Sequence, residues 1–160
     1  MEIEREIFVS LITSIITWVA LTFGKTIIIP FYERLVYKGV SIQGIWSQNI
    51  KYDMGTPNQI EYTETINITQ KANKITGIYT VTNIIPGQKT TTAIYTIQGS
   101  IINGYVTFKG EISNNNKVGI CSFLLRVTSG GAIMIGSNIF IDQNIDGISA
   151  YPDQTYTRQS

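Results

Sequence analysis

The longest apolar stretch of the chain constrains its architecture most. Between Ile7 and Ile29 the only charged residue is Lys25. Because roughly 20 predominantly apolar helical residues cross a hydrocarbon core about 30 Å thick, this segment is long enough to form a membrane-spanning helix. The residues after Lys38 are instead rich in β-branched and aromatic types. The sequence therefore predicts one membrane helix joined to a β-rich domain.

Two alternatives for this segment fit the residues less well. A cleaved signal peptide begins with basic residues and ends at a small-residue site, whereas this chain starts MEIEREI and has no such site after the apolar run. A buried helix that is apolar all round needs a groove, which a strand-rich remainder does not offer. Hydroxyl residues are compatible with a span because they can bond to the carbonyl one turn earlier, and their spacing favours helix self-association in lipid. These residues are Ser10, Thr13, Ser14, Thr17 and Thr22.

Basic residues near the span predict its orientation. Arg5 precedes the helix, whereas Lys25, Arg34 and Lys38 lie within or after it. Because Lys and Arg accumulate on the cytoplasmic side, the C-terminal domain is expected in the cytoplasm. The segment after Pro30 is expected to lie along the membrane interface, where aromatic side chains anchor. These anchors are Phe31, Tyr32 and Tyr37.

The β-rich part divides into eight segments separated by turn signals. The turns are expected at 55–58, 72–74, 86–88, 103–104, 114–116, 130–131 and 146–147. The strands are expected near 42–52, 59–70, 74–83, 90–100, 103–113, 117–128, 131–141 and 147–158. Eight short antiparallel strands predict an all-β up-and-down barrel, or a closely related sandwich, because closure removes exposed strand edges. We therefore expect two domains, a helix with its linker at 1–37 and a barrel at 38–160.

Alternation along these strands predicts which side chains face the interior. Aromatic and polar residues fall on the same inward face as aliphatic residues. These inward residues are Trp46, Gln48, Tyr62, Glu64, Tyr79 and Tyr95. An eight-stranded barrel can hold one small ligand or be filled by its own side chains. Aromatic rings interspersed with polar groups are typical of a ligand pocket, but the same tyrosines could simply pack with their hydroxyl groups at the barrel mouth.

Composition excludes several classes of function. The net charge of +1 argues against a DNA- or RNA-binding surface, which would carry clustered Lys and Arg. The absence of His removes the commonest general base and metal ligand. The single cysteine, Cys121, cannot form an internal disulfide and is expected to be a buried thiol. We therefore expect neither an enzyme nor a bound metal or other cofactor.

The order of these parts resembles a known family. A membrane helix, a short linker, a strand opening with Gly44-Ile45-Trp46, the segment ITGIYTV at Ile75–Val81 and an eight-stranded barrel are similar to the CD-NTase-associated membrane effectors of CBASS antiphage defence. The resemblance implies a barrel that binds a cyclic oligonucleotide made by a cognate nucleotidyltransferase. Ligand binding would then drive homo-oligomerisation and disruption of the bacterial inner membrane. Two membrane helices are typical of the family, whereas this chain has room for one, unless 7–23 and 26–37 form a tight hairpin.

A cyclic dinucleotide or trinucleotide needs aromatic faces for its bases and donors for its phosphates. The candidates for base stacking are Trp46, Tyr62, Tyr79, Tyr95, Tyr105 and Phe123. The candidates for phosphate contacts are Lys109, Arg126 and Arg158. Alternation places Arg126 on the face opposite Phe123, so it reaches a ligand only at the mouth or after a bulge.

A different function stays open. Lipocalin-like barrels also begin with Gly-x-Trp, so the chain could be a membrane-tethered barrel that binds a hydrophobic ligand or a partner protein without toxicity. The two readings require different interiors. A nucleotide needs cationic or amide donors inside the barrel, whereas a lipid needs a nearly uniform apolar wall.

Overall fold

A computed structural model describes residues 2–29, 31–32, 39–52, 59–113, 119–142 and 148–159. The chain divides into two compact units, Met1–Lys38 and Gly39–Ser160. The first contains helical structure and the second is the barrel, and each is described by itself. Several predicted features lie outside the described residues. They are part of the interfacial segment (Pro30 and 33–38), the turns at 55–58, 114–116 and 146–147, and half of the second arm (26–37) of the alternative hairpin.

The N-terminal unit contains an α-helix, α1 (Glu2–Phe23), continued by a short π-helical segment, η1 (Gly24–Ile28). The stretch Arg5–Ile28 is long and apolar enough to cross a membrane, and none of it is buried within the protein. The predicted backbone bonds of the hydroxyl residues are confirmed at four positions, each to the carbonyl four residues earlier. The donors are Thr13, Ser14, Thr17 and Thr22, at 2.8–2.9 Å. Each hydroxyl is thus satisfied within the helix, as an apolar environment requires.

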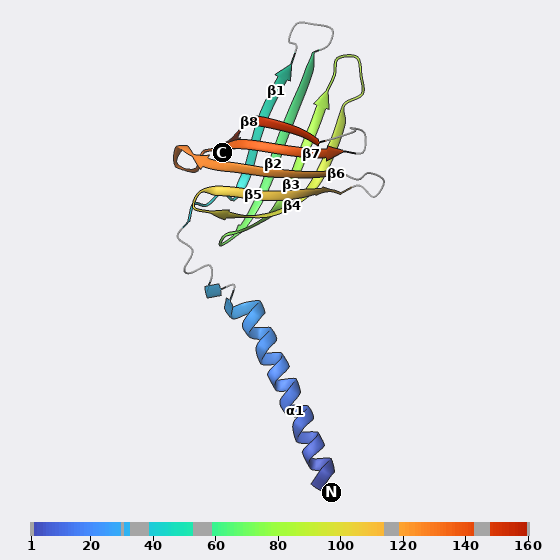
Figure 1. Cartoon of the computed structure of the whole chain (residues 1–160), viewed down its shortest axis with the longest axis vertical. Helices are drawn as coiled ribbons and strands as arrows, with labels where there is room; N and C mark the ends of the chain where they lie inside the picture. The colour runs from blue at the N-terminus through green and yellow to red at the C-terminus, as the bar shows by residue number, and fades with distance from the viewer. Residues whose placement is uncertain are drawn as a thin grey trace. The chain divides into compact units, whose positions relative to one another are not determined.

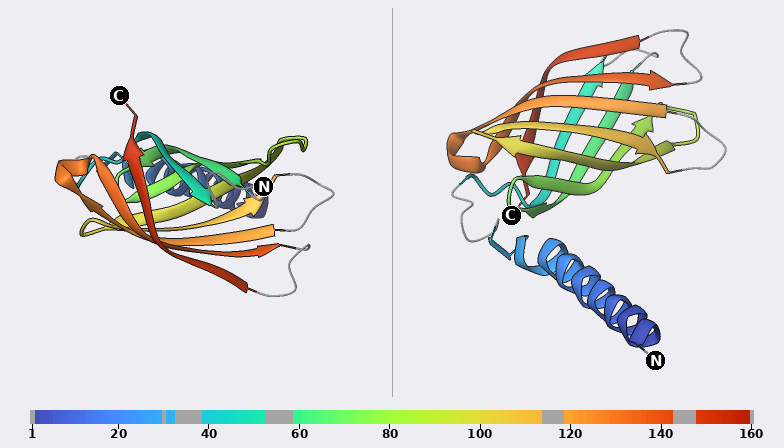
Figure 2. Two further views of the ribbon diagram at one scale, coloured as in Figure 1. Left: turned by 90° about the horizontal axis from the view of Figure 1, so that it is seen from above. Right: turned by 60° about the horizontal axis from the view of Figure 1, so that its bottom comes forward.

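The second unit is a closed, antiparallel, eight-stranded barrel in which each strand pairs with the next (Figure 1). The strands are β1 (Gly44–Tyr52), β2 (Ile60–Lys71), β3 (Lys74–Ile84), β4 (Thr91–Ile102), β5 (Tyr105–Ile112), β6 (Gly119–Thr128), β7 (Ile133–Asp142) and β8 (Ile148–Arg158). The predicted fold class is confirmed, and the strand ends differ from those expected by at most two residues. The wall formed by β1–β4 faces the wall formed by β5–β8, and the strands of the two walls cross steeply (Figures 1 and 2).

The two ends of the barrel differ in burial. The end near the first and last residues of the barrel is filled by fully buried side chains, and we call it the closed end. These side chains include Ile42, Trp46, Ile101, Leu125 and Met134. At the opposite end, which bears the β1–β2, β3–β4, β5–β6 and β7–β8 connections, inward positions are only half-buried, and we call it the open end. Its inward residues include Ile50, Tyr62, Val81, Asn83 and Phe140.

Glycines within the strands allow neighbouring strands to approach closely, as Gly99 and Gly136 show. A Cβ atom added at Gly99 would lie 1.9 Å from the carbonyl oxygen of Thr107, and one at Gly136 would lie 2.0 Å from that of Leu124. Any side chain there would push the strands apart. Glycine in a strand interior marks such bends, so these positions help the sheet to close.

The contact that closes the barrel, between β1 and β8, is short. The described strand pairing covers Trp46 with Arg158 and Ser47 with Thr157, and beside it the backbone N–H of Gln159 donates to the carbonyl of Ile45 at 2.8 Å. Further along β8, two residues (Pro152 and Asp153) stand opposite one residue of β7, and Asp153 has a φ of 59°. This β-bulge bends β8 locally. The seam between β1 and β8 is therefore the part of the wall with the least backbone pairing.

Candidate functional site

A connected set of polar side chains lies inside the barrel where the seam loses its backbone pairing. The Oε2 atom of Glu64 accepts hydrogen bonds from the hydroxyl of Tyr156 at 2.5 Å and from Nε2 of Gln48 at 2.8 Å. Gln48 also bridges the seam, because its Oε1 accepts from the backbone N–H of Thr155 at 3.0 Å and its Nε2 lies 2.5 Å from Oε1 of Gln154. Side-chain bonds thus replace the backbone pairing here.

This set continues toward β3 and β7. Nδ2 of Asn138 lies 3.5 Å from the Tyr156 hydroxyl. The charge of Glu64 contributes to the raised pKa of the Tyr79 hydroxyl, so Tyr79 belongs to the same set. We call the whole set the interior polar cluster. It consists of Gln48, Glu64, Tyr79, Asn138, Gln154 and Tyr156.

Glu64 is a buried carboxylate without a basic partner in the described part of the barrel. Its residue is 6% exposed, and the other buried polar residues are the neutral Asn138 and Gln154. The ion pairs described on the barrel join Lys51 to Glu61 and Lys109 to Glu111, at 3.2 and 3.1 Å. Burying a charge is costly unless it is paired and hydrogen-bonded. Neutral donors alone therefore hold Glu64 in place.

Some polar atoms of this region have no partner among the described residues. They are the Tyr79 hydroxyl, Oδ1 of Asn138 and Oδ1 of Asn83. Tyr79 and Asn138 are 0% and 1% exposed, so water outside the barrel does not reach their side chains. Nearly all buried polar groups in proteins have a hydrogen-bond partner. The unpartnered atoms thus mark a place that its own side chains leave incomplete.

Aromatic rings surround the interior polar cluster. The ring centroid of Tyr79 lies 5.0 Å from Phe123, 5.7 Å from Tyr95 and 6.0 Å from Phe140. Phe140 in turn lies 5.9 Å from Tyr151, which is 39% exposed. The aromatic surface thus extends from the buried centre of the barrel to a solvent-accessible side chain.

Burial also changes the acidity of three groups in the interior. It raises the pKa of the Cys121 thiol to about 12. Burial, reinforced by the charge of Glu64, raises the pKa values of the Tyr156 and Tyr79 hydroxyls well above their ordinary value of 10.0. All three groups are therefore neutral in the folded protein at physiological pH, so both tyrosines keep their hydroxyl protons, and Tyr156 donates its proton in the hydrogen bond to Glu64.

These pKa shifts predict alkaline instability. In the unfolded chain the thiol and the two hydroxyls ionise near pH 9 to 10, whereas in the folded protein they keep their protons. The unfolded state therefore binds fewer protons, and the free energy of unfolding should fall from about pH 9 up to about pH 12, by up to about 1.4 kcal/mol per pH unit for each group. Urea denaturation at pH 7 to 11 measures this slope. The slope should be smaller in Cys121→Ala, and an unchanged slope would contradict the assignment.

The structure brings together some of the predicted ligand-binding residues. Trp46, Tyr79, Tyr95 and Phe123 are all inside the barrel and at most 4% exposed. Tyr62 is half-buried at the open end. The predicted inward positions of Gln48 and Glu64 are confirmed by their hydrogen bonds to each other and to β8. Sequence reasoning did not single out Asn138, Gln154 or Tyr156.

Three predicted residues lie elsewhere. Tyr105, Lys109 and Arg126 are on the outer face, because the inward positions of β5 are Val106, Phe108 and Gly110 and those of β6 are Cys121, Phe123 and Leu125. The outward position of Arg126 is the one that the alternation predicts, and Tyr105 and Lys109 likewise point away from the interior aromatic rings. Arg158 is exposed at the closed end, where its guanidinium lies 5.8 Å from the centre of the Trp46 ring and donates to the carbonyl of Gln43.

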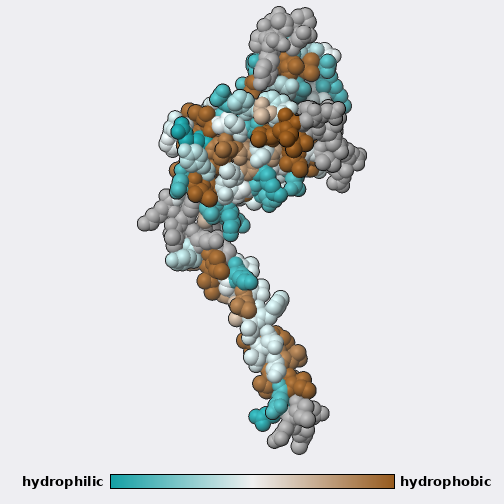
Figure 3. Space-filling model, viewed as in Figure 1, coloured by the Kyte–Doolittle hydropathy of each residue, from teal (hydrophilic) through white to brown (hydrophobic). Residues whose placement is uncertain are grey.

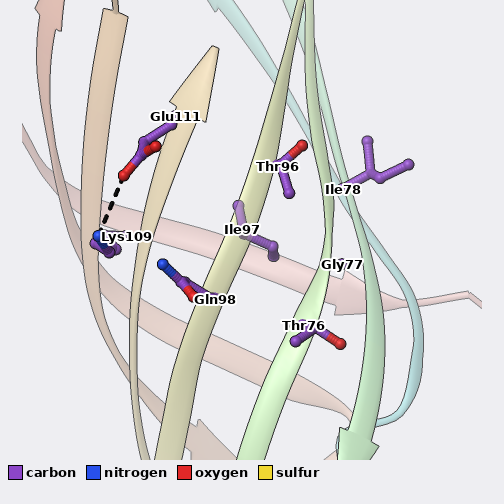
Figure 4. Close-up of a pocket in the computed structure, with 8 residues that line it drawn as sticks. All are labelled: Thr76, Gly77, Ile78, Thr96, Ile97, Gln98, Lys109 and Glu111. Carbon is purple, nitrogen blue, oxygen red and sulfur yellow. Dashed lines mark hydrogen bonds and ion pairs between the residues drawn. The ribbon is translucent and has the colours of Figure 1, made fainter. Parts of the chain in front are cut away.

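An outer depression of about 390 Å³ lies over β3, β4 and β5. Its lining comprises Thr76, Gly77, Ile78, Thr96, Ile97, Gln98, Lys109 and Glu111. Figure 4 shows the Lys109 ammonium directed at the Glu111 carboxylate. This pairing neutralises the one basic side chain of the depression, so the depression does not offer an unpaired cation to an anionic ligand.

The outer face also carries exposed apolar side chains. On β6 and β7, Ile120 and Leu124 are 46% and 58% exposed, and Ile135, Ile139 and Ile141 are 39–49% exposed. Ile120 pairs with Ile141, and Ser122 pairs with Ile139, so these residues are neighbours across the two strands. We call Ile120, Leu124, Ile135, Ile139 and Ile141 the outer apolar patch. The space-filling view shows apolar side chains among polar ones on the barrel surface (Figure 3).

The interior polar cluster is the candidate site, because it combines buried polar atoms, aromatic rings and a weakly paired seam. Comparison of the chain with protein-family models, curated proteins and solved structures finds no match. The residues themselves therefore carry the functional argument. Over the described ranges, no group of three or more Cys, Asp and Glu side chains could hold a metal ion. The chemistry that the cluster offers is hydrogen bonding and stacking.

Proposed function

We propose that the chain is a membrane-anchored receptor and effector whose barrel binds a cyclic oligonucleotide second messenger. The helix α1 crosses the bacterial inner membrane once, and the barrel lies in the cytoplasm. Binding of the cyclic nucleotide drives homo-oligomerisation and disruption of the membrane, so that the cell stops growing during phage infection. The activating ligand is a cyclic dinucleotide or trinucleotide from a cognate nucleotidyltransferase.

The observation that carries this proposal is the polar character of the barrel interior. A barrel that binds lipid has a nearly uniform apolar wall. This interior instead presents amide groups from Gln48, Gln154 and Asn138 beside the Glu64 carboxylate. Amide and carboxylate groups among aromatic rings match the hydrogen-bonding edges and flat faces of nucleobases. They therefore favour a nucleotide over a hydrophobic ligand.

Two further features support the effector part of the proposal. The stretch Arg5–Ile28 is long and apolar enough to anchor the chain in a bilayer. The outer apolar patch brings exposed apolar side chains of β6 and β7 together on the exterior, and contiguous exposed patches of this kind often mark protein–protein contacts. We propose a second copy of the barrel as the partner of this patch in the ligand-bound state.

Calorimetric titration tests the receptor function directly. The full chain in detergent micelles is titrated with a panel of cyclic dinucleotides and trinucleotides. We expect one member of the panel to bind with a sub-micromolar Kd, which corresponds to more than about 8 kcal/mol of binding free energy. Light scattering of the same sample should show a larger assembly after ligand is added. Absence of heat with every member would contradict the proposal and favour a lipocalin-like barrel for a hydrophobic ligand or a partner protein.

A further inference from the structure

The unpartnered atoms in the barrel are mainly hydrogen-bond acceptors. Oδ1 of Asn138 and Oδ1 of Asn83 are acceptor atoms that have no donor among the described residues. The Glu64 carboxylate between them can also only accept when it is ionised. Asn138 connects to Glu64 through the Tyr156 hydroxyl. Asn83 lies two residues beyond Val81, which pairs directly with Glu64. The acceptors therefore follow one another from the buried cluster toward the open end.

This arrangement is unsuited to a phosphate group. A phosphate is anionic and presents only acceptor oxygens at neutral pH, so it needs Arg, Lys or backbone donors. The candidates Lys109 and Arg126 are on the outside, and Arg158 is at the closed end, away from the open end. A buried carboxylate would also repel the negative charge of a phosphate. The group that fits must be uncharged or cationic and must carry N–H donors.

A guanine base has the complementary chemistry. Its N1–H and its N2 amino group are adjacent donors, which a carboxylate can accept together, and its N7 and O6 atoms are acceptors. The Tyr79 hydroxyl has no partner among the described residues. It can therefore donate a hydrogen bond to N7 or O6 of the base. The rings of Tyr79, Tyr95 and Phe140 offer faces for the flat purine.

We propose that the interior polar cluster reads a guanine base of the ligand, with the carboxylate of Glu64 accepting from the base. The base enters from the open end, and the phosphates stay toward that end, outside the cluster. The side chain of Gln48 moves aside when the base enters, because it is only half-buried and lies at the weakly paired seam. This inference rests on the proposed function, since it names the part of the cyclic nucleotide that the barrel recognises.

The substitution Glu64→Gln tests the inference while preserving shape. It replaces one acceptor oxygen by an NH₂ donor that faces the donors of the base. We expect the affinity for cyclic diguanylate to fall at least about tenfold. Because the substitution removes a buried charge without a basic partner, the Tm without ligand should stay the same or rise. Lost binding at an unchanged Tm then reports recognition rather than unfolding.

The matched control is Glu61→Gln, in the same strand. Glu61 is paired with Lys51 rather than with the interior polar cluster. This variant should bind cyclic diguanylate as the unsubstituted chain does. The full chain in detergent micelles is titrated in parallel with cyclic diguanylate and with cyclic diuridylate, whose smaller base lacks an amino group, and we expect cyclic diuridylate to bind at least tenfold more weakly.

The outcomes separate this inference from the proposed function. A loss of cyclic diguanylate binding in Glu64→Gln but not in Glu61→Gln supports base reading by the cluster. Equal binding of cyclic diguanylate and cyclic diuridylate, or binding that Glu64→Gln leaves unchanged, overturns the inference and leaves the receptor function intact. Failure of the unsubstituted chain to bind any cyclic nucleotide overturns both.

Discussion

Replacing Trp46 by alanine is expected to lower the free energy of unfolding of the barrel by about 3–5 kcal/mol. Trp46 is 0% exposed, and its indole N–H donates to the carbonyl of Ile42 at 2.8 Å. Its partner in the β1–β8 pairing is Arg158, whose guanidinium lies over the ring. The substitution thus leaves a large cavity at the closed end and removes a contact that closes the barrel. A loss of this size is a large part of the stability of a small domain.

Trp18 provides the matched control for this experiment. It is 68% exposed on α1, in the other unit of the chain. Trp18→Ala should leave the unfolding of the barrel unchanged when both variants are unfolded in urea and followed by far-UV circular dichroism. A loss below about 1 kcal/mol in Trp46→Ala would show that the closed end repacks without the indole, and would contradict its structural role.

The barrel itself could be predicted because its signal is local and repeats along the chain. Inward residues alternate with outward ones in strands such as β6, where Cys121, Phe123 and Leu125 are buried and the residues between them are exposed. Such alternation follows from strand geometry alone. The same rule correctly placed Gln48 and Glu64 inside and Arg126 outside. The fold, and the inward or outward direction of these side chains, could thus be predicted from the sequence.

The composition of the candidate site was less predictable, because it depends on pairing between distant strands. Gln154 reaches Gln48, and Tyr156 reaches Glu64, only when β8 closes against β1. The bulge at Pro152–Asp153 adds a residue to β8 and so shifts which of its side chains face inward. A period-two pattern read along the last strand does not reveal that shift. Lys109 and Arg126 were predicted for a different reason. They were chosen because a phosphate needs basic donors, and that criterion does not identify the groups that contact a base.

The second large effect concerns the helix and separates binding from toxicity. We expect expression of the full chain together with its cognate cyclic nucleotide to arrest growth, and deletion of residues 1–37 to abolish the arrest. The barrel has its own core and closes on itself, so the remaining 38–160 should still bind the nucleotide. Growth curves measure the arrest, and titration of purified 38–160 measures the binding.

A milder pair of variants tests whether insertion in the membrane is what matters. Ile15 and Ile16 lie near the middle of the apolar stretch and are 54% and 62% exposed. Changing both to arginine places two charges there, each costing about 2.5–3.5 kcal/mol on insertion scales, whereas changing both to leucine keeps the apolar surface. The arginine variant should leave the membrane fraction and fail to arrest growth, and the leucine variant should behave like the unsubstituted chain. Toxicity that survives either the deletion or the arginine substitutions would mean that the barrel, rather than the anchored helix, stops growth.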